Sequence, residues 1–165
     1  MDPLTNDTAS LAGDFRDCIE VLNAHSVVFV LVGGFAVGWH GVVRATGDID
    51  FLYEQSSRNV TRLCAALEEF GAPAHLIDAD FLLSPEAVTQ IGIEPLRIDL
   101  LSSISGVSFE TVRAGAVEAD IGGLRLLIIG LDELCTNKRA TGRIKDKEDL
   151  RRLTPRSKTP GKRRT

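Results

Sequence analysis

Apolar residues in this chain recur at two spacings, one typical of helices and one typical of buried strands. Leu11, Phe15, Ile19 and Leu22 follow the spacing of an amphipathic helix, whereas Val27–Val32 is a continuous apolar run. By these patterns we expect helices at 8–24, 35–40, 59–70, 132–140 and 145–153. We expect strands at 27–32, 48–54, 96–101, 109–112, 116–121 and 124–129, and shorter ones at 76–77 and 88–93. The alternation predicts an α/β domain with a mixed sheet flanked by helices.

Glycine residues mark the expected ends of several of these elements. Gly71 and Gly142 follow two of the predicted helices, where a left-handed glycine commonly ends a helix. Gly122-Gly123 separates two apolar runs and predicts the turn of a hairpin.

Length and composition agree with a single folded domain. The chain has 165 residues, of which 44% are hydrophobic and 25% are charged, as in ordinary globular proteins. No apolar run reaches the roughly 18 residues of a membrane span, and the first residues do not resemble a signal peptide. For this reason we expect no membrane partner. The chain has three cysteines and no Cys-x-x-Cys motif, so we expect Cys18, Cys64 and Cys135 to be free thiols in a reducing cytoplasm.

Charge is distributed unevenly along the chain. Residues 1–150 contain all 23 acidic residues and 12 of the 19 basic ones, a net charge of −11, whereas residues 151–165 carry +7. We therefore expect a folded domain over 1–153 and a basic, disordered tail over 154–165. Basic tails can bind the phosphates of RNA or can simply be solvated. The absence of aromatic residues, which would stack on bases, favours the second alternative.

Two acidic residues, Asp48 and Asp50, lie in a predicted strand with Ile49 between them and Phe51 after them. Side chains alternate along a strand, so both carboxylates should face one side while Ile49 and Phe51 face a core. Two such charges about 4 Å apart repel by roughly 4 kcal/mol at an effective dielectric constant of about 20. A hard divalent cation is the commonest reason to keep such a pair, and capping of a turn is the alternative. The pattern favours a metal site.

The diglycine Gly33-Gly34 directly follows the apolar strand 27–32. Glycine lets the backbone approach a ligand closely, and the free N–H groups of a helix that starts there suit a phosphate group. A simple tight turn is the alternative explanation of these two residues. A phosphate-binding turn next to a metal site indicates a nucleoside triphosphate with its metal ion.

The segment 32–34 (Val-Gly-Gly), followed by 48–51 (Asp-Ile-Asp-Phe), resembles the signature of the nucleotidyltransferase superfamily related to DNA polymerase beta. The stretch 44–48 (Arg-Ala-Thr-Gly-Asp) further resembles a variant found in the AbiEii-type toxin branch and in related uncharacterised bacterial nucleotidyltransferases. Asp99, within the apolar run 96–101, is similar to the third carboxylate of the family, and 137–150 resembles the closing motif of that branch. The resemblance extends over roughly residues 27–153.

The resemblance implies an enzyme that moves a nucleoside monophosphate from an NTP to an acceptor. It implies that Asp48, Asp50 and Asp99 are catalytic and hold Mg²⁺ or Mn²⁺. It also implies nucleotide contacts from a second set of residues: Gly33, Gly34, Arg44, Thr46 and Lys138. For Asp146 and Asp149, a functional role and ion pairs along a charged helix both remain open. For Asp99, an ion pair with Arg97 is the structural alternative.

The sequence leaves the acceptor undefined, because nucleic acid such as RNA, a protein and a small molecule all fit. The toxin branch suggests one component of a toxin–antitoxin pair, which would bind the other component. The rival hypothesis is a non-catalytic module of the same fold that binds a nucleotide or a protein partner. A complete set of three carboxylates argues against this rival, since binding alone does not need all three.

Overall fold

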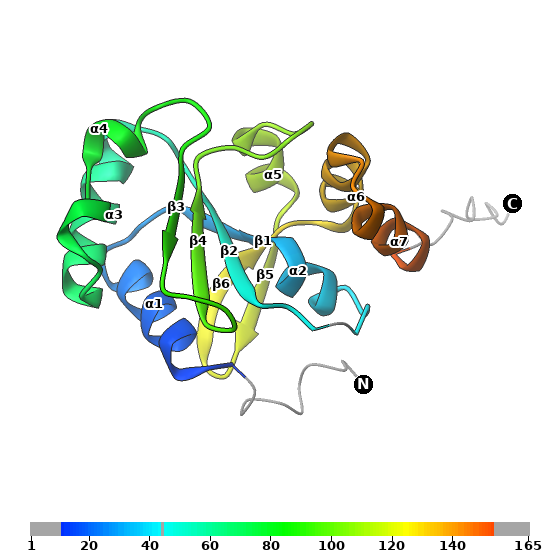
Figure 1. The fold of residues 1–165 in the computed structure, drawn as a ribbon, viewed down its shortest axis with the longest axis horizontal. Coiled ribbons are helices and arrows are strands. Elements are labelled where there is room, and N and C mark those ends of the chain that lie inside the picture. The colour runs from blue at the N-terminus through cyan, green and yellow to red at the C-terminus, as the bar shows by residue number, and fades with distance from the viewer. Residues whose placement is uncertain (1–10, 44, 154–165) are drawn as a thin grey trace, which may run out of the picture.

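The computed structural model describes residues 11–43 and 45–153, and within them a six-stranded mixed sheet is flanked by seven α-helices (Figure 1). The strands are β1 (Phe29–Val32), β2 (Asp48–Tyr53), β3 (Val88–Ile91), β4 (Arg97–Leu101), β5 (Val117–Ile121) and β6 (Leu124–Ile128). The helices are α1 (Gly13–Ala24), α2 (Gly33–Trp39), α3 (Ser57–Phe70), α4 (Ala79–Leu82), α5 (Phe109–Gly115), α6 (Leu131–Thr141) and α7 (Ile144–Arg152), with a 3-10 helix at Ala74–Leu76. The predicted α/β class and mixed sheet are confirmed.

The strands lie in the order β3-β4-β2-β1-β6-β5. Strands β2 and β4 are parallel, as are β1 and β6, whereas β1–β2, β3–β4 and β5–β6 are antiparallel pairs. Strand β2 is therefore flanked by β1 on one side and β4 on the other. Side chains on one face of β2 are brought next to side chains from two segments that are distant in sequence.

The hydrophobic core explains which way β2 faces. Ile49 and Phe51 are both buried, and the Phe51 ring packs edge-on against Phe29 of β1 at a centroid distance of 5.4 Å. Figure 1 shows α1 and α3 on one side of the sheet and α2, α6 and α7 on the other. The alternation predicted for this strand is confirmed, because Asp48 and Asp50 are less buried than the apolar residues between and after them.

Several predicted element ends are confirmed by their backbone geometry. Gly71 and Gly142 end α3 and α6 in the left-handed conformation, with φ of 87° and 63°. Gly122 and Gly123, also at positive φ, turn the chain between the antiparallel strands β5 and β6. Glycine is favoured at such positions because it has no Cβ to clash with the carbonyl group.

Three predicted elements differ from the structure. The segment 109–112, predicted as a strand, is the start of helix α5, whose N-terminus is capped by Ser108 accepting from the Thr111 amide at 3.2 Å. The predicted strand 76–77 is wrong as well, since a 3-10 helix occupies Ala74–Leu76. Helix α1 begins only at Gly13, and residues 8–10 lie outside the described part of the chain. The predicted tail at 154–165 lies outside it too.

Along residues 11–43 and 45–153, the helices are too short or too polar for any of them to span a membrane. Cys18, Cys64 and Cys135 are free thiols, as expected. Burial raises the pKa of the Cys18 thiol to about 12. This thiol is therefore protonated at neutral pH and is a core residue rather than a nucleophile.

Candidate active site

The parallel pairing of β2 with β4 builds the candidate site. In this register Asp48 is opposite Arg97, and Asp50 is opposite Asp99. The antiparallel neighbours add Val32 beside Asp50 and Gln90 beside Asp99. Residues opposite each other in a sheet point to the same face, so the two strands bring all three predicted carboxylates together.

The three carboxylates form a tight group. One oxygen each from Asp48, Asp50 and Asp99 can be chosen so that all lie within 4.8 Å of one another. Asp99 is buried, and Asp48 and Asp50 are half-buried. Burial, and then the negative charges of Asp48 and Asp99, raise the pKa of Asp50 to about 7. The protein alone therefore does not fully compensate the negative charge at Asp50.

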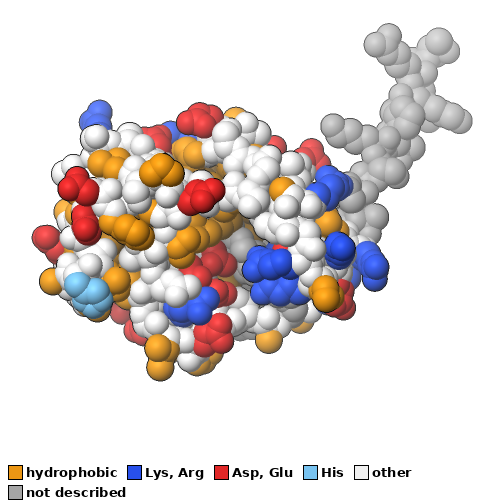
Figure 2. All heavy atoms as spheres, turned by 45° about the horizontal axis from the view of Figure 1, so that its top comes forward, with side chains coloured by type: hydrophobic (Ala, Val, Ile, Leu, Met, Phe, Trp, Pro, Cys, Tyr) orange, Lys and Arg blue, Asp and Glu red, His pale blue; other side chains and the backbone are white. Residues whose placement is uncertain are grey.

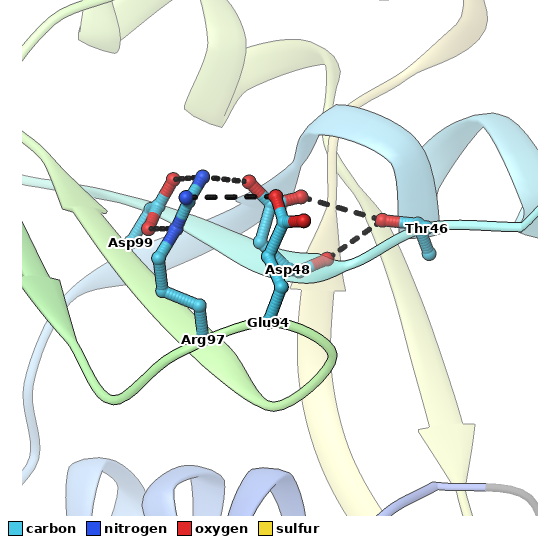
Figure 3. Close-up of polar contacts among 5 residues, drawn as sticks. All are labelled: Thr46, Asp48, Glu94, Arg97 and Asp99. Carbon is cyan, nitrogen blue, oxygen red and sulfur yellow. Dashed lines mark hydrogen bonds and ion pairs between the residues drawn. The ribbon is translucent and has the colours of Figure 1, made fainter.

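Arg97 lies among these acids and contacts two of them (Figure 3). Its Nη2 atom is 2.7 Å from Oδ2 of Asp48 and 3.2 Å from Oδ2 of Asp99, and its Nε atom is 2.9 Å from Oδ1 of Asp99. Its Nη1 atom is 3.6 Å from Glu94. The Arg97–Asp99 ion pair, which the sequence left open, is present and extends to Asp48.

Gly33 gives Asp50 the room it needs. The residue has a φ of 72°, and a Cβ built on it would lie 2.0 Å from Oδ2 of Asp50. Because Gly33 has no side chain, the Asp50 carboxylate can lie close to the backbone at this position. Gly34 is buried in the first turn of α2. Both glycines line the same cleft as Asp50.

The loop before β2 supports Asp48. The Thr46 hydroxyl donates to the backbone oxygen of Asp48 at 2.8 Å and lies 3.4 Å from its Oδ1 atom (Figure 3). Thr46 therefore fixes the entry into the strand that carries the first two acids. Arg44, the other predicted loop residue, lies outside the described part of the chain.

A cleft of about 510 Å³ connects these groups. Of the predicted residues that the structure describes, the following line it: Gly33, Gly34, Thr46, Asp48, Asp50, Asp99 and Lys138. It also contains polar residues that the sequence did not indicate as site residues: Gln90, Glu94, Asn137, Thr141, Arg143 and Lys145. Figure 2 shows acidic side chains in a hollow with a group of Lys and Arg side chains beside it. One end of the cleft is thus acidic, and the α6–α7 side is basic.

Lys138 is buried in a network of charges between α6 and α7. Its Nζ atom is 2.9 Å from Oδ1 of Asp146 and 3.2 Å from Oδ2 of Asp149. The other oxygen of Asp146 accepts from Thr141 at 2.6 Å and from Arg143 at 2.8 Å. Burial alone would raise the pKa of Asp146, but these hydrogen bonds outweigh it and hold the pKa well below its usual range.

This network places Asp146 and Asp149 behind Lys138. Both carboxylates are buried, and neither is among the residues that line the cleft. The ion pairs expected for these two acids are present. Lys138, on the preceding helix, pairs with both acids, and Arg143 also pairs with Asp146. Asp146 and Asp149 therefore hold Lys138 at the edge of the cleft.

The profile of one protein family matches residues 12–163, and that family is described as nucleotidyl transferase of unknown function (DUF2204). The chain belongs to this family. Membership confirms the resemblance to the nucleotidyltransferase superfamily and identifies the protein as a nucleotidyltransferase. Among curated proteins, none matches the sequence significantly.

Two solved structures share the fold of this nucleotidyltransferase. TM1012 of Thermotoga maritima, a candidate nucleotidyltransferase, has a TM-score of 0.56 and 15% identity, covering 83% of this chain and 88% of its own. The lincosamide antibiotic adenylyltransferase LnuA, in its lincomycin-bound structure, has a TM-score of 0.58 and 13% identity, covering 87% of this chain and 96% of its own. At these identities the likeness shows the common fold alone.

In this nucleotidyltransferase, three residues of the cleft were hard to recognise from the sequence: Gln90, Arg143 and Lys145. Gln90 is on the edge strand β3 and reaches the cleft only through its pairing with Asp99. Arg143 and Lys145 belong to the closing motif, where their place beside Lys138 was a usable signal. Charged residues at a helix start are so common, however, that spacing alone does not single them out.

Proposed function

We propose that this protein is a metal-dependent enzyme that transfers a nucleoside monophosphate from an NTP to an acceptor and releases pyrophosphate. The observation that carries the proposal is the convergence of Asp48, Asp50 and Asp99 in one cleft with Gly33 and Gly34. Family membership supplies the reaction class.

The three carboxylates fit a divalent cation. The cluster offers only oxygen ligands, which suit Mg²⁺ and Mn²⁺. The raised pKa of Asp50 indicates negative charge that the surrounding protein does not balance, and a bound cation would balance it. When bound, such ions neutralise the phosphate oxygens and stabilise the attacking and leaving oxygens of an in-line displacement.

The remaining residues have roles in binding and orientation. The backbone N–H groups at Gly33 and Gly34 would bind phosphate oxygens, since both residues line the cleft beside the acids. Arg143 and Lys145 supply positive charge on the opposite side, where the leaving pyrophosphate would lie. Lys138, which Asp146 and Asp149 hold at the edge of the cleft, would contact the same phosphates. Thr46 orients Asp48 through the hydrogen bond from its hydroxyl to the backbone oxygen of Asp48.

The acceptor is proposed as a hydroxyl or phosphate group on RNA, on a protein or on a small molecule. LnuA is an adenylyltransferase with lincomycin bound, and the shared fold supports testing small hydroxyl compounds alongside macromolecules. A role in a toxin–antitoxin pair, in the cytoplasm, remains part of the proposal because of the resemblance of 44–48 and 137–150 to the toxin branch.

A non-catalytic nucleotide-binding module is the second candidate function. One observation favours it: Arg97 already contacts two of the three acids, as a structural ion pair would. In that case the carboxylates would hold the sheet together and no chemistry would follow. Turnover in the presence of metal distinguishes the two functions.

The test is incubation of the full-length protein with each α-labelled NTP, Mg²⁺ or Mn²⁺, and separate acceptor pools of RNA, cell-extract protein and small hydroxyl compounds. Pyrophosphate release coupled to label on one pool would support the proposal. Asp99→Asn should abolish the transfer. Asp120→Asn, which removes an acid on the edge strand β5 outside the cleft, should retain it. Stoichiometric NTP binding with no pyrophosphate from any pool would favour the binding module.

A further inference from the structure

Arg97 is a positive charge placed inside the group of acids that would bind the metal. It contacts one oxygen of Asp48 and both oxygens of Asp99 through two of its nitrogen atoms. The Arg97 side chain is 25% exposed and that of Asp99 is 8% exposed, so the guanidinium lies between the buried acid and the solvent. The planar guanidinium contacts the two oxygens of Asp99 through two different nitrogens, a forked contact that the single nitrogen of a lysine cannot make.

These contacts involve both oxygens of Asp99 and one of the two oxygens of Asp48, so a cation held by Asp99 would share an oxygen with Arg97. A cation bound to Asp48 and Asp99 would lie next to a guanidinium that donates to both of them. Like charges at such distances repel, and the repulsion is larger in a partly buried site than in water. Arg97 and a divalent ion are therefore alternatives for at least part of this oxygen set.

We propose that Arg97 is a resident counter-cation that competes with the divalent metal for Asp48 and Asp99 and so lowers the metal affinity of the cluster. This inference rests on the proposed function, because it assumes that the three carboxylates are the metal site. Without metal, Arg97 keeps Asp48 and Asp99 close together. With metal, it releases at least one of them.

Glu94 gives the released guanidinium a second partner. It is 3.6 Å from Nη1 of Arg97, and its side chain is 65% exposed. Glu94 also lines the cleft, so Arg97 can turn from the acids toward Glu94 without leaving the site. In that position its charge faces the cleft, where a nucleotide phosphate would bind. Binding of the metal would therefore also move Arg97 into a position where it can contact the nucleotide.

The test is the affinity of metal-free, full-length protein for Mn²⁺ alone, measured from the EPR signal of the free ion. Arg97→Gln should bind Mn²⁺ at least about tenfold more tightly than the wild type, because the competing charge is gone. In EDTA the same variant should melt about 2–4 °C lower, since Asp48 and Asp99 lose their counter-cation. Arg113→Gln is the matched control: Arg113 pairs with Glu54 at 3.4 Å outside the cleft, and its loss should leave Mn²⁺ affinity unchanged.

Arg97→Lys keeps the positive charge and serves as a second variant in case Arg97→Gln does not fold. A single ammonium nitrogen cannot reproduce the contact of two guanidinium nitrogens with the two oxygens of Asp99, so we expect Mn²⁺ affinity about threefold or more above that of the wild type. Unchanged or weaker Mn²⁺ binding in the folded Arg97 variants would overturn the competition and make Arg97 a support for the ligands. If neither wild type nor variants bind Mn²⁺ at millimolar concentration, the metal site itself fails, and with it the proposed function.

Discussion

The carboxylate of Asp50 occupies space that only a glycine at position 33 leaves open. A Cβ on Gly33 would lie 2.0 Å from Oδ2 of Asp50, and the φ of 72° already disfavours any side chain there. Strand β1 ends at Val32, directly opposite Asp50, so the turn into α2 passes over the acid. Gly33 and Asp50 thus depend on each other for their positions.

Gly33→Ala should therefore damage both the fold and the site. The left-handed backbone alone costs about 1–2 kcal/mol for a residue with a Cβ, and displacement of Asp50 adds to this. We expect a loss of roughly 2–4 kcal/mol in urea unfolding and a clear loss of Mn²⁺ affinity in calorimetry. Gly41→Ala is the matched control, because Gly41 has a φ of 99° and no atom within 4 Å of its Cβ position. Equal effects of the two substitutions would show that the contact with Asp50 does not matter.

The double substitution Asp48→Asn/Asp50→Asn should abolish stabilisation by Mg²⁺–NTP. A ligand at 100 times its Kd stabilises the folded state by about 2.7 kcal/mol, which is visible as a rise in melting temperature. Removing two of the three charges also relieves their mutual repulsion, so the metal-free variant should be as stable as the wild type or more so. Glu118→Gln, on the exposed part of β5, serves as control and should keep the full shift. A full Mg²⁺–NTP response in the double variant would place the metal elsewhere.

Lys138→Met should strongly destabilise the protein by leaving Asp146 and Asp149 without their shared ammonium group. All three side chains are at most 5% exposed, and breaking a buried ion pair typically costs about 3–5 kcal/mol. We expect a loss of about 3 kcal/mol in urea unfolding at neutral pH. The variant that carries Lys138→Met with Asp146→Asn and Asp149→Asn should recover part of it, because no buried charge remains unbalanced. No recovery would mean that the packing of the lysine stem, and not its charge, is what stabilises α6 against α7.

Asp146 should contribute its full stabilisation of the fold above about pH 4 and progressively less as the pH falls further. Hydrogen bonds from Thr141, Lys138 and Arg143 overcome the effect of burial and place the folded-state pKa below the ordinary value of 3.8. The folded state therefore binds fewer protons than the unfolded state as the pH falls. The stabilisation is complete above the unfolded pKa and disappears as the pH approaches the folded pKa.

The measurement for this pH effect is urea unfolding of the wild type and Asp146→Asn at pH 7, 5, 4 and 3. The stability difference between them should be constant from pH 7 to 5 and should shrink below about pH 4. Leu153→Ala truncates a buried apolar side chain and is the control. It lowers stability without removing an acid, so its stability difference from the wild type should not change with pH in this way. A difference that stays constant down to pH 3 would contradict the lowered pKa of Asp146.

The sequence by itself determined most of the elements and singled out the three acids that the fold brings together. Continuous apolar runs and period-two alternation are local signals, so they predict strands β2 and β4 without any tertiary contact. The same alternation predicts that Asp48 and Asp50 share the face of β2 that points away from the core. Gly71 and Gly142 were predictable for the same reason, since a left-handed cap depends on the backbone of one residue. The segment 109–112 forms a helix because Phe109 and Val112 have helical spacing and Ser108 caps the helix N-terminus.

Only the tertiary structure decided which charges meet. The parallel register of β2 and β4 determines that Arg97 is opposite Asp48, 49 residues away, and the sequence contains no local signal for that register. The same holds for Asn59, a buried residue of α3 that hydrogen-bonds the backbone of Val28 and Glu54. It holds as well for Lys138, whose ammonium group pairs with Asp146 and Asp149 instead of lying free in the cleft. Periodicity fixes which face a side chain takes, whereas its partner depends on how separate elements pack.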